Sequence, residues 1–126
     1  LGLSARLDVL GPLDDDGLAA AYRSATVFAY PSILEGFGLP PLEAMASGTP
    51  VVCADAASLP EVVGDAGVLF DGGVEALAAA IDELLEDPGR RAALRRAGLE
   101  RARRITWRHA ADGTVALLRS SCGPVR

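Results

Sequence analysis

Two glutamates flank a glycine-rich turn in the stretch YPSILEGFGLPPLEAMASGTPVV, which covers residues 30–52. Glu35 and Glu43 stand eight positions apart, and Gly36 and Gly38 lie between them. A carboxylate offers two acceptor oxygens, which suits the two hydroxyls of a vicinal diol such as that of a ribose. The glycines lack a Cβ atom and therefore let a ligand approach the backbone closely. This combination of residues indicates a binding site for a polyol.

The same turn also indicates a phosphate site. A helix is expected to begin at Pro40 and Pro41, and the N–H groups at the start of a helix favour an anion. One loop can therefore hold a ribose at Glu43, a pyrophosphate at the backbone and a second polyol at Glu35. The backbone donors are those of Gly36, Phe37, Gly38 and Leu39.

Other interpretations of the two glutamates stay open. An alternative explanation of Glu43 is that its negative charge interacts with the positive end of the helix dipole and binds no ligand. A metal site lacks a third ligand, because the only histidine, His109, is distant in the sequence. The motif G-x-G-x-x-P at residues 36–41, followed by Asp55, imitates the dinucleotide-binding fingerprint, although proline replaces its third glycine. No Gly-x-Ser-x-Gly motif supports a nucleophilic serine, and no residue is assigned a catalytic role.

The composition is that of a globular domain rather than a nucleic-acid-binding protein. Of the 126 residues, 50% are hydrophobic and 23% are charged. The net charge of −5 opposes binding to a polyanion. No apolar run approaches the roughly 18 residues that span a bilayer, and no signal peptide opens the sequence. Cys53 and Cys122 show no metal or redox spacing, so we expect a cytoplasmic protein with reduced cysteines.

The basic residues are all arginines, and eight of the twelve lie within residues 90–108. The preferred interpretation of this stretch is the solvated face of late helices. A basic stretch is also able to contact an anionic membrane. The full protein is therefore compatible with a peripheral position at the inner face of the plasma membrane.

Short apolar runs alternate with helical patterns, which predicts an α/β fold with an open, Rossmann-like parallel sheet and flanking helices. In such sheets ligands bind at the carboxyl ends of the strands, where residues 35–39 follow the strand at 26–31. We expect one domain over residues 1–120 and a frayed tail at 121–126. The strands are expected at 6–11, 26–31, 49–55 and 66–71, and the helices at 14–25, 40–47, 58–65, 74–87, 90–104 and 107–120.

The segment VFAYPSILEGFGLPPLEAMASGTPVVCADAASLPEVVGDAGVLF, residues 27–70, closely resembles the C-terminal, donor-binding half of retaining glycosyltransferases of family 4, which have the GT-B fold. The E-x7-E element from Glu35 to Glu43 is that family's signature, and the resemblance extends into both flanks. It implies transfer of a sugar of the hexose type from a nucleotide sugar to an acceptor, with retention of anomeric configuration. It also implies that no metal or other cofactor is required.

The resemblance assigns a role to each part of the candidate site. Glu35 is expected to contact hydroxyls of the transferred sugar, and Glu43 the diol of the ribose. The backbone amides of residues 36–39 are expected to contact sugar hydroxyls and the distal phosphate. Gly11 and Leu13 belong to the loop that is expected to line the nucleobase.

The chain also departs from the family pattern, because such enzymes have two Rossmann-like domains. The N-terminal acceptor domain has no counterpart here, nor does the opening part of the donor domain with the Arg and Lys that neutralise the pyrophosphate. We therefore expect a domain fragment that is inactive alone and whose open sheet edge is able to pair with a second copy. The alternatives are a stand-alone nucleotide-sugar-binding module, a half-enzyme that complements another chain and, less favoured, an NAD-binding domain.

Overall fold

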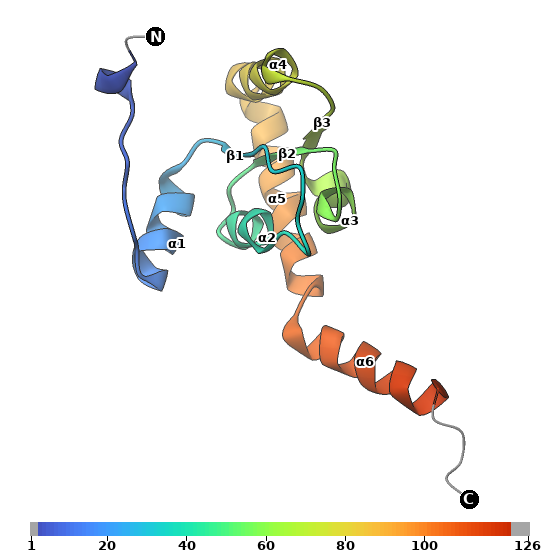
Figure 1. Cartoon of the computed structure of the whole chain (residues 1–126). Helices are drawn as coiled ribbons and strands as arrows, with labels where there is room; N and C mark the ends of the chain where they lie inside the picture. Colours follow the sequence, from blue (N-terminus) through green and yellow to red (C-terminus); the bar gives the residue numbers. More distant parts are fainter. Residues whose placement is uncertain (1–2, 122–126) are drawn as a thin grey trace, which may run out of the picture.

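The computed structural model describes residues 3–121, which form a three-stranded parallel sheet with helices on both faces (Figure 1). The strands are β1 (Phe28–Tyr30), β2 (Val51–Ala54) and β3 (Val68–Phe70), in the order β1-β2-β3. The helices are α1 (Asp15–Ser24), α2 (Leu39–Ala46), α3 (Leu59–Val63), α4 (Val74–Glu86), α5 (Pro88–Arg104) and α6 (Trp107–Ser121), with 3-10 turns at η1 (Ser4–Arg6) and η2 (Gly64–Ala66).

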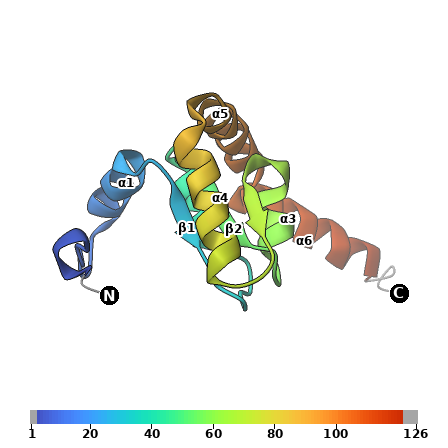
Figure 2. The ribbon, with the colours of Figure 1, turned by 90° about the horizontal axis from the view of Figure 1, so that it is seen from above.

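The central strand β2 separates two hydrophobic clusters. Side chains alternate between the faces of a strand, so Val51 and Cys53 pack with α2 and α3 on one face. Val52 packs on the other face with Ala80 and Leu84 of α4, the helix that lies over the sheet in Figure 2. All four β2 residues are buried. The parallel pairing of the strands, with helices packed on both faces, confirms the predicted Rossmann-like sheet.

The predicted strand at residues 6–11 is wrong. Arg6 belongs to the 3-10 turn η1, and residues 7–13 form no strand. This segment runs beside α1 and away from the sheet in both ribbon views (Figures 1 and 2). Val9 is 85% exposed and Leu7 68%. A strand exists through hydrogen bonds to a neighbouring strand, and the described residues place none beside this segment.

The two ends of the described chain are the most exposed parts of the structure. Helix α6 projects from the body of the molecule (Figure 1), and all of its residues are exposed. The hydroxyl of Thr106 accepts a hydrogen bond from the His109 N–H group at 3.1 Å and thereby caps the beginning of α6. The predicted frayed tail and Cys122 fall outside the described residues, apart from Ser121, which ends α6. Within residues 3–121, none of the helices has both the length and the apolar character that crossing a bilayer requires.

Candidate functional site

The candidate site begins where β1 ends, at the carboxyl edge of the sheet. The chain leaves β1 at Tyr30, passes through Glu35 and enters α2 after Gly38. Gly38 is the N-cap residue of α2 and has a φ of +102°. A Cβ atom at this position would lie 2.8 Å from Leu59 Cδ2. Both the backbone conformation and the packing against α3 therefore require a glycine here.

Replacing Gly38 by alanine is expected to lower the free energy of unfolding by about 1–3 kcal/mol, because the new methyl group strains the backbone and displaces Leu59. Chemical denaturation measures the change. Gly36→Ala is the matched control, because a Cβ atom at Gly36 would meet nothing within 4 Å. Equal stability losses in the two variants would contradict the structural requirement at Gly38.

Glu35 is held by two hydroxyl groups that converge on one oxygen of its carboxylate. Tyr30 Oη donates to Glu35 Oε1 at 2.6 Å, and Ser32 Oγ donates to the same oxygen at 2.7 Å. The hydrogen bond from Tyr30, followed by that from Ser32, lowers the pKa of Glu35 below its ordinary value. Hydrogen bonds to the charged form have this effect, so Glu35 is an acceptor rather than an acid at neutral pH.

Ser58 fixes the backbone of the same loop, a role that the sequence did not reveal. Ser58 stands at the N-cap position of α3, but its side chain forms no capping bond. Its hydroxyl lies 2.8 Å from the carbonyl oxygen of Phe37 and 3.2 Å from that of Glu35. The loop between β1 and α2 is therefore attached to the beginning of α3.

Glu43 lies one residue further along α2 than expected and just beyond its first turn, because the helix already begins at Leu39 and that turn contains no acid. Its Oε2 accepts a hydrogen bond of 3.3 Å from Tyr22 Oη of α1. Glu43 also lines an open cavity of about 360 Å³ between α1 and α2, where Asp15 and Ser47 contribute polar groups. Glu43 is exposed, so its carboxylate is accessible to a ligand from this cavity.

Tyr22 links the two helices beside Glu43. Its side chain is 8% exposed, and its carbonyl oxygen accepts a 2.6 Å hydrogen bond from the buried Thr49 hydroxyl. Burial, followed by the charge of Glu43, raises the pKa of Tyr22 from its ordinary 10.0 to about 12. The fold therefore favours the neutral phenol.

Folding stability is expected to fall at high pH in a way that depends on Tyr22. A pKa that is raised by folding contributes stability that is present below the unfolded-state pKa and is lost as pH rises toward the folded-state pKa, here between pH 10 and about 12. Tyr22→Phe removes this contribution, so its unfolding free energy should fall less steeply over that range. Urea denaturation from pH 8 to 12 measures both slopes.

The burial of Cys53 supplies the internal comparison for this experiment. Burial raises the pKa of the Cys53 thiol from 9.0 to about 12, and this contribution remains in the Tyr22→Phe variant. The variant should therefore retain part of the alkaline loss of stability. Identical slopes in the two proteins would refute the assignment of the remaining part to Tyr22.

The structure does not bring the predicted nucleobase residues into contact with the glutamates. Gly11 and Leu13 are exposed and precede α1, and Leu13 lies against Gly17 in the first turn of that helix. Helix α1 nevertheless connects the two regions, because Asp15 of its first turn and Tyr22 line the cavity that contains Glu43. No described contact joins Glu35 to Glu43, which face different neighbours.

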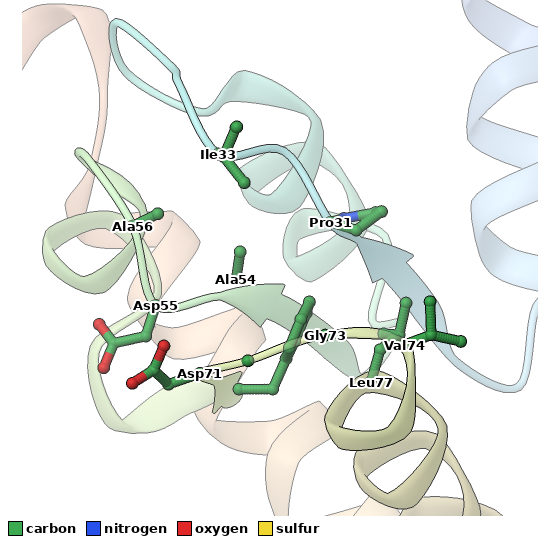
Figure 3. Close-up of a pocket in the computed structure, with 11 residues that line it drawn as sticks. Pro31, Ile33, Ala54, Asp55, Ala56, Asp71, Gly73, Val74 and Leu77 are labelled. Carbon is green, nitrogen blue, oxygen red and sulfur yellow. The ribbon is translucent and has the colours of Figure 1, made fainter.

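A second pocket lies at the carboxyl ends of all three strands (Figure 3). It has a volume of about 220 Å³. Pro31 and Ile33 approach it from the loop after β1, and the carboxylates of Asp55 and Asp71 lie near each other at the ends of β2 and β3. The sequence pointed to Asp55 only through the dinucleotide interpretation and missed Asp71, although both acids directly follow a strand. Within residues 3–121, no three metal-ligating side chains come together.

Comparisons with known proteins relate this geometry to one family. The family described as Glycosyl transferases group 1 matches residues 1–101. The chain is 45% identical over 107 residues to the O-antigen chain mannosyltransferase B of Escherichia coli, a match that covers 84% of this chain and 28% of the relative. It is 41% identical over 118 residues to the D-inositol 3-phosphate glycosyltransferase of Rhodococcus jostii (strain RHA1), which covers 91% of this chain and 26% of the relative.

A solved structure shows the same arrangement of elements. The sucrose-phosphate synthase from Thermosynechococcus elongatus matches with a TM-score of 0.83 and 34% sequence identity, over 94% of this chain and 31% of that chain. This likeness confirms the Rossmann-like architecture of the GT-B fold. The chain spans between about a quarter and a third of the length of the relatives named above.

Proposed function

This chain belongs to the group 1 glycosyltransferases, and we propose that it is the donor-binding part of a retaining glycosyltransferase of family 4. The whole enzyme moves a sugar from a nucleoside-diphosphate sugar to an acceptor. The arrangement of Glu35 and Glu43 around the start of α2 carries this proposal. One carboxylate lies on each side of a glycine-containing helix N-terminus, and both carboxylates have oxygens available to ligand hydroxyls.

The two glutamates bind opposite ends of the donor in this proposal. Glu43 accepts from the ribose diol, because it lines the cavity between α1 and α2. The nucleobase lies toward Gly11 and Leu13, at the beginning of α1. The phosphates lie at the backbone amides of residues 36–39, where the positive end of α2 favours an anion. Glu35 accepts from hydroxyls of the transferred sugar.

The transferred sugar is a hexose in this proposal. The name of the Escherichia coli relative, a mannosyltransferase, supports this class of sugar. Binding is achieved by carboxylates and backbone amides, so we propose that neither a metal nor another cofactor takes part. Negative charge that develops on the pyrophosphate as the glycosyl bond breaks is stabilised by the preorganised amides.

The whole enzyme acts in the cytoplasm in this proposal, with peripheral contact at the inner face of the plasma membrane. The arginines of α5 support such a contact only in part, because several have partners within the chain. Arg101 Nε donates to the carbonyl oxygen of Val62 at 2.5 Å, and Arg90 and Arg104 pair with Glu83 and Glu100. Arg91 also donates to the carbonyl oxygens of Leu84 and Leu85. Arg95, Arg96 and Arg103 of α5 are exposed and available to an anionic surface.

Titration of the isotope-labelled chain with UDP-, GDP- and ADP-sugars tests the proposal. NMR chemical-shift changes are expected at residues 35–43 and in the first turn of α1 for at least one nucleotide. NAD is the competing ligand in the same experiment, since the dinucleotide interpretation predicts binding that depends on Asp55. If no nucleotide sugar perturbed these residues, while NAD did, the glycosyltransferase donor site would have to be abandoned.

A further inference from the structure

The two glutamates of the site are each held by a tyrosine, and the two tyrosines belong to one aromatic cluster. Tyr22 packs edge-on against Phe28, with ring centroids 5.2 Å apart. Phe28 in turn stacks on Tyr30 with a centroid separation of 5.8 Å. Tyr22 donates to Glu43 and Tyr30 donates to Glu35. The cluster therefore joins α1 and β1 beneath both carboxylates.

The Glu35 carboxylate accepts more and shorter hydrogen bonds than the Glu43 carboxylate. Tyr30 and Ser32 both donate to Oε1 of Glu35, at 2.6 and 2.7 Å. An oxygen of a carboxylate accepts about two hydrogen bonds, so this oxygen is fully used. Within residues 3–121, the hydrogen bonds that the Glu35 side chain accepts are both to Oε1. Among the same residues, Glu43 accepts one longer bond of 3.3 Å at Oε2 and none at Oε1.

We propose that Tyr30 and Ser32 are positioning residues, which orient the Glu35 carboxylate and leave Oε2 as its single acceptor for hydroxyls of the transferred sugar. This proposal rests on the proposed function. Glu35 then recognises the sugar through one oxygen, whereas Glu43 is able to contact a diol with both. The stacking of Tyr30 on Phe28 fixes the direction of the phenol, and the Ser58 hydroxyl holds the carbonyl oxygen of Glu35.

The first test needs no ligand. The pKa of Glu35 is followed by NMR of its carboxyl carbon in the wild type, Tyr30→Phe and Ser32→Ala. Each variant removes one donor to the carboxylate, so the pKa of Glu35 should move upward toward its ordinary value in both. Thr114→Ala is the control, because the Thr114 hydroxyl donates to the backbone of α6. A pKa that stayed at the wild-type value in both variants would overturn the proposal.

The second test measures how much the sugar contributes to binding. The dissociation constants of UDP, GDP and ADP are compared with those of UDP-glucose, GDP-mannose and ADP-glucose, for whichever pair the wild type binds. Tyr30→Phe and Ser32→Ala should each reduce the preference for the nucleotide sugar over the nucleotide by about threefold to tenfold. Tyr22→Phe is the matched variant at Glu43, and it should weaken the nucleotide and its sugar derivative to the same extent.

A double-mutant cycle with Glu35→Ala separates positioning from a general structural effect. In the Glu35→Ala background, Tyr30→Phe should cause no further loss of sugar preference. A loss of the same size in both backgrounds would overturn the proposal and leave the donor site itself intact. A wild-type chain that bound none of the nucleotides or nucleotide sugars would refute the proposed function and, with it, the role of Tyr30 and Ser32.

Discussion

Replacing Glu43 by alanine is expected to weaken binding of both the nucleotide and the nucleotide sugar by about 1.5–3 kcal/mol, as for the loss of hydrogen bonds to a charged group. This corresponds to a rise in the dissociation constant of about tenfold to hundredfold. The reason is that Glu43 lines the cavity between α1 and α2. It lies on α2, next to the proposed phosphate position. Calorimetric or NMR titration with UDP-, GDP- and ADP-sugars measures the effect.

Two variants make this experiment decisive. Glu86→Ala is the control, because Glu86 is an exposed glutamate at the end of α4 and lies outside both pockets. Asp55→Ala tests the dinucleotide interpretation, which assigns the ribose to Asp55. Unchanged affinity for every nucleotide in Glu43→Ala would remove Glu43 from the ribose site. A loss in Asp55→Ala alone, together with NAD binding, would favour the dinucleotide site.

The sequence predicted those elements whose hydrophobic pattern agrees with their packing. The predicted strand at 49–55 contains a continuous apolar run at 50–54, and β2 within this run is buried on both faces. The pattern of 74–87 predicts Leu77, Ile81, Leu84 and Leu85 on one side of a helix. The first three pack against the sheet as part of α4, whereas Leu85 is 49% exposed. Local pattern and tertiary environment point to the same structure in both segments.

The prediction at residues 6–11 failed because the sequence pattern of a strand does not show whether a partner strand is present. Leu7 and Val9 flank a single acid, as in a half-buried strand, and Leu10 follows directly. These three side chains are all more than half exposed, at 68%, 85% and 63%. The segment therefore has strand-forming residues and no neighbour among the described residues to form hydrogen bonds with.

Some side-chain pairs of the site could not be predicted from the sequence, for a different reason. Tyr22 and Glu43 are 21 positions apart, and Ser58 and Phe37 are also 21 positions apart. Only the parallel crossovers bring such residues together. The spacing of Glu35 and Glu43 was visible in the sequence, whereas the hydrogen bonds of Tyr22 to Glu43 and of Ser58 to Phe37 depend on how α1, α2 and α3 are arranged.

Several surfaces of the chain have no partner among the described residues. The strand β1 is an edge strand, the segment at 7–13 has exposed apolar side chains, and α6 exposes Trp107 and Leu117. Unpaired strand edges and exposed apolar residues favour association. We propose that further parts of a longer enzyme cover them, and that the isolated chain is able to pair with a second copy through the β1 edge instead.

Sugar transfer by the isolated 126-residue chain is expected to be undetectable, although the chain retains weak affinity for the donor. The chain corresponds to 28% of the mannosyltransferase relative and 26% of the inositol phosphate glycosyltransferase relative, and our proposal places the acceptor site in the remainder. Catalysis by proximity requires both substrates to be held in reacting geometry, which the donor site alone does not provide. Release of nucleoside diphosphate and labelling of acceptors from a radiolabelled nucleotide sugar measure transfer.

The protein that the whole reading frame encodes provides the comparison for this last prediction. If that protein contains the acceptor site, it should transfer the sugar and bind the donor more tightly, because groups from both parts then contact the pyrophosphate. Glu35→Ala in the longer protein should abolish transfer, because Glu35 is proposed to hold the sugar whose bond is broken. Transfer by the purified 126-residue chain would show instead that residues 1–126 hold both substrates, and the division into donor and acceptor parts would then be wrong.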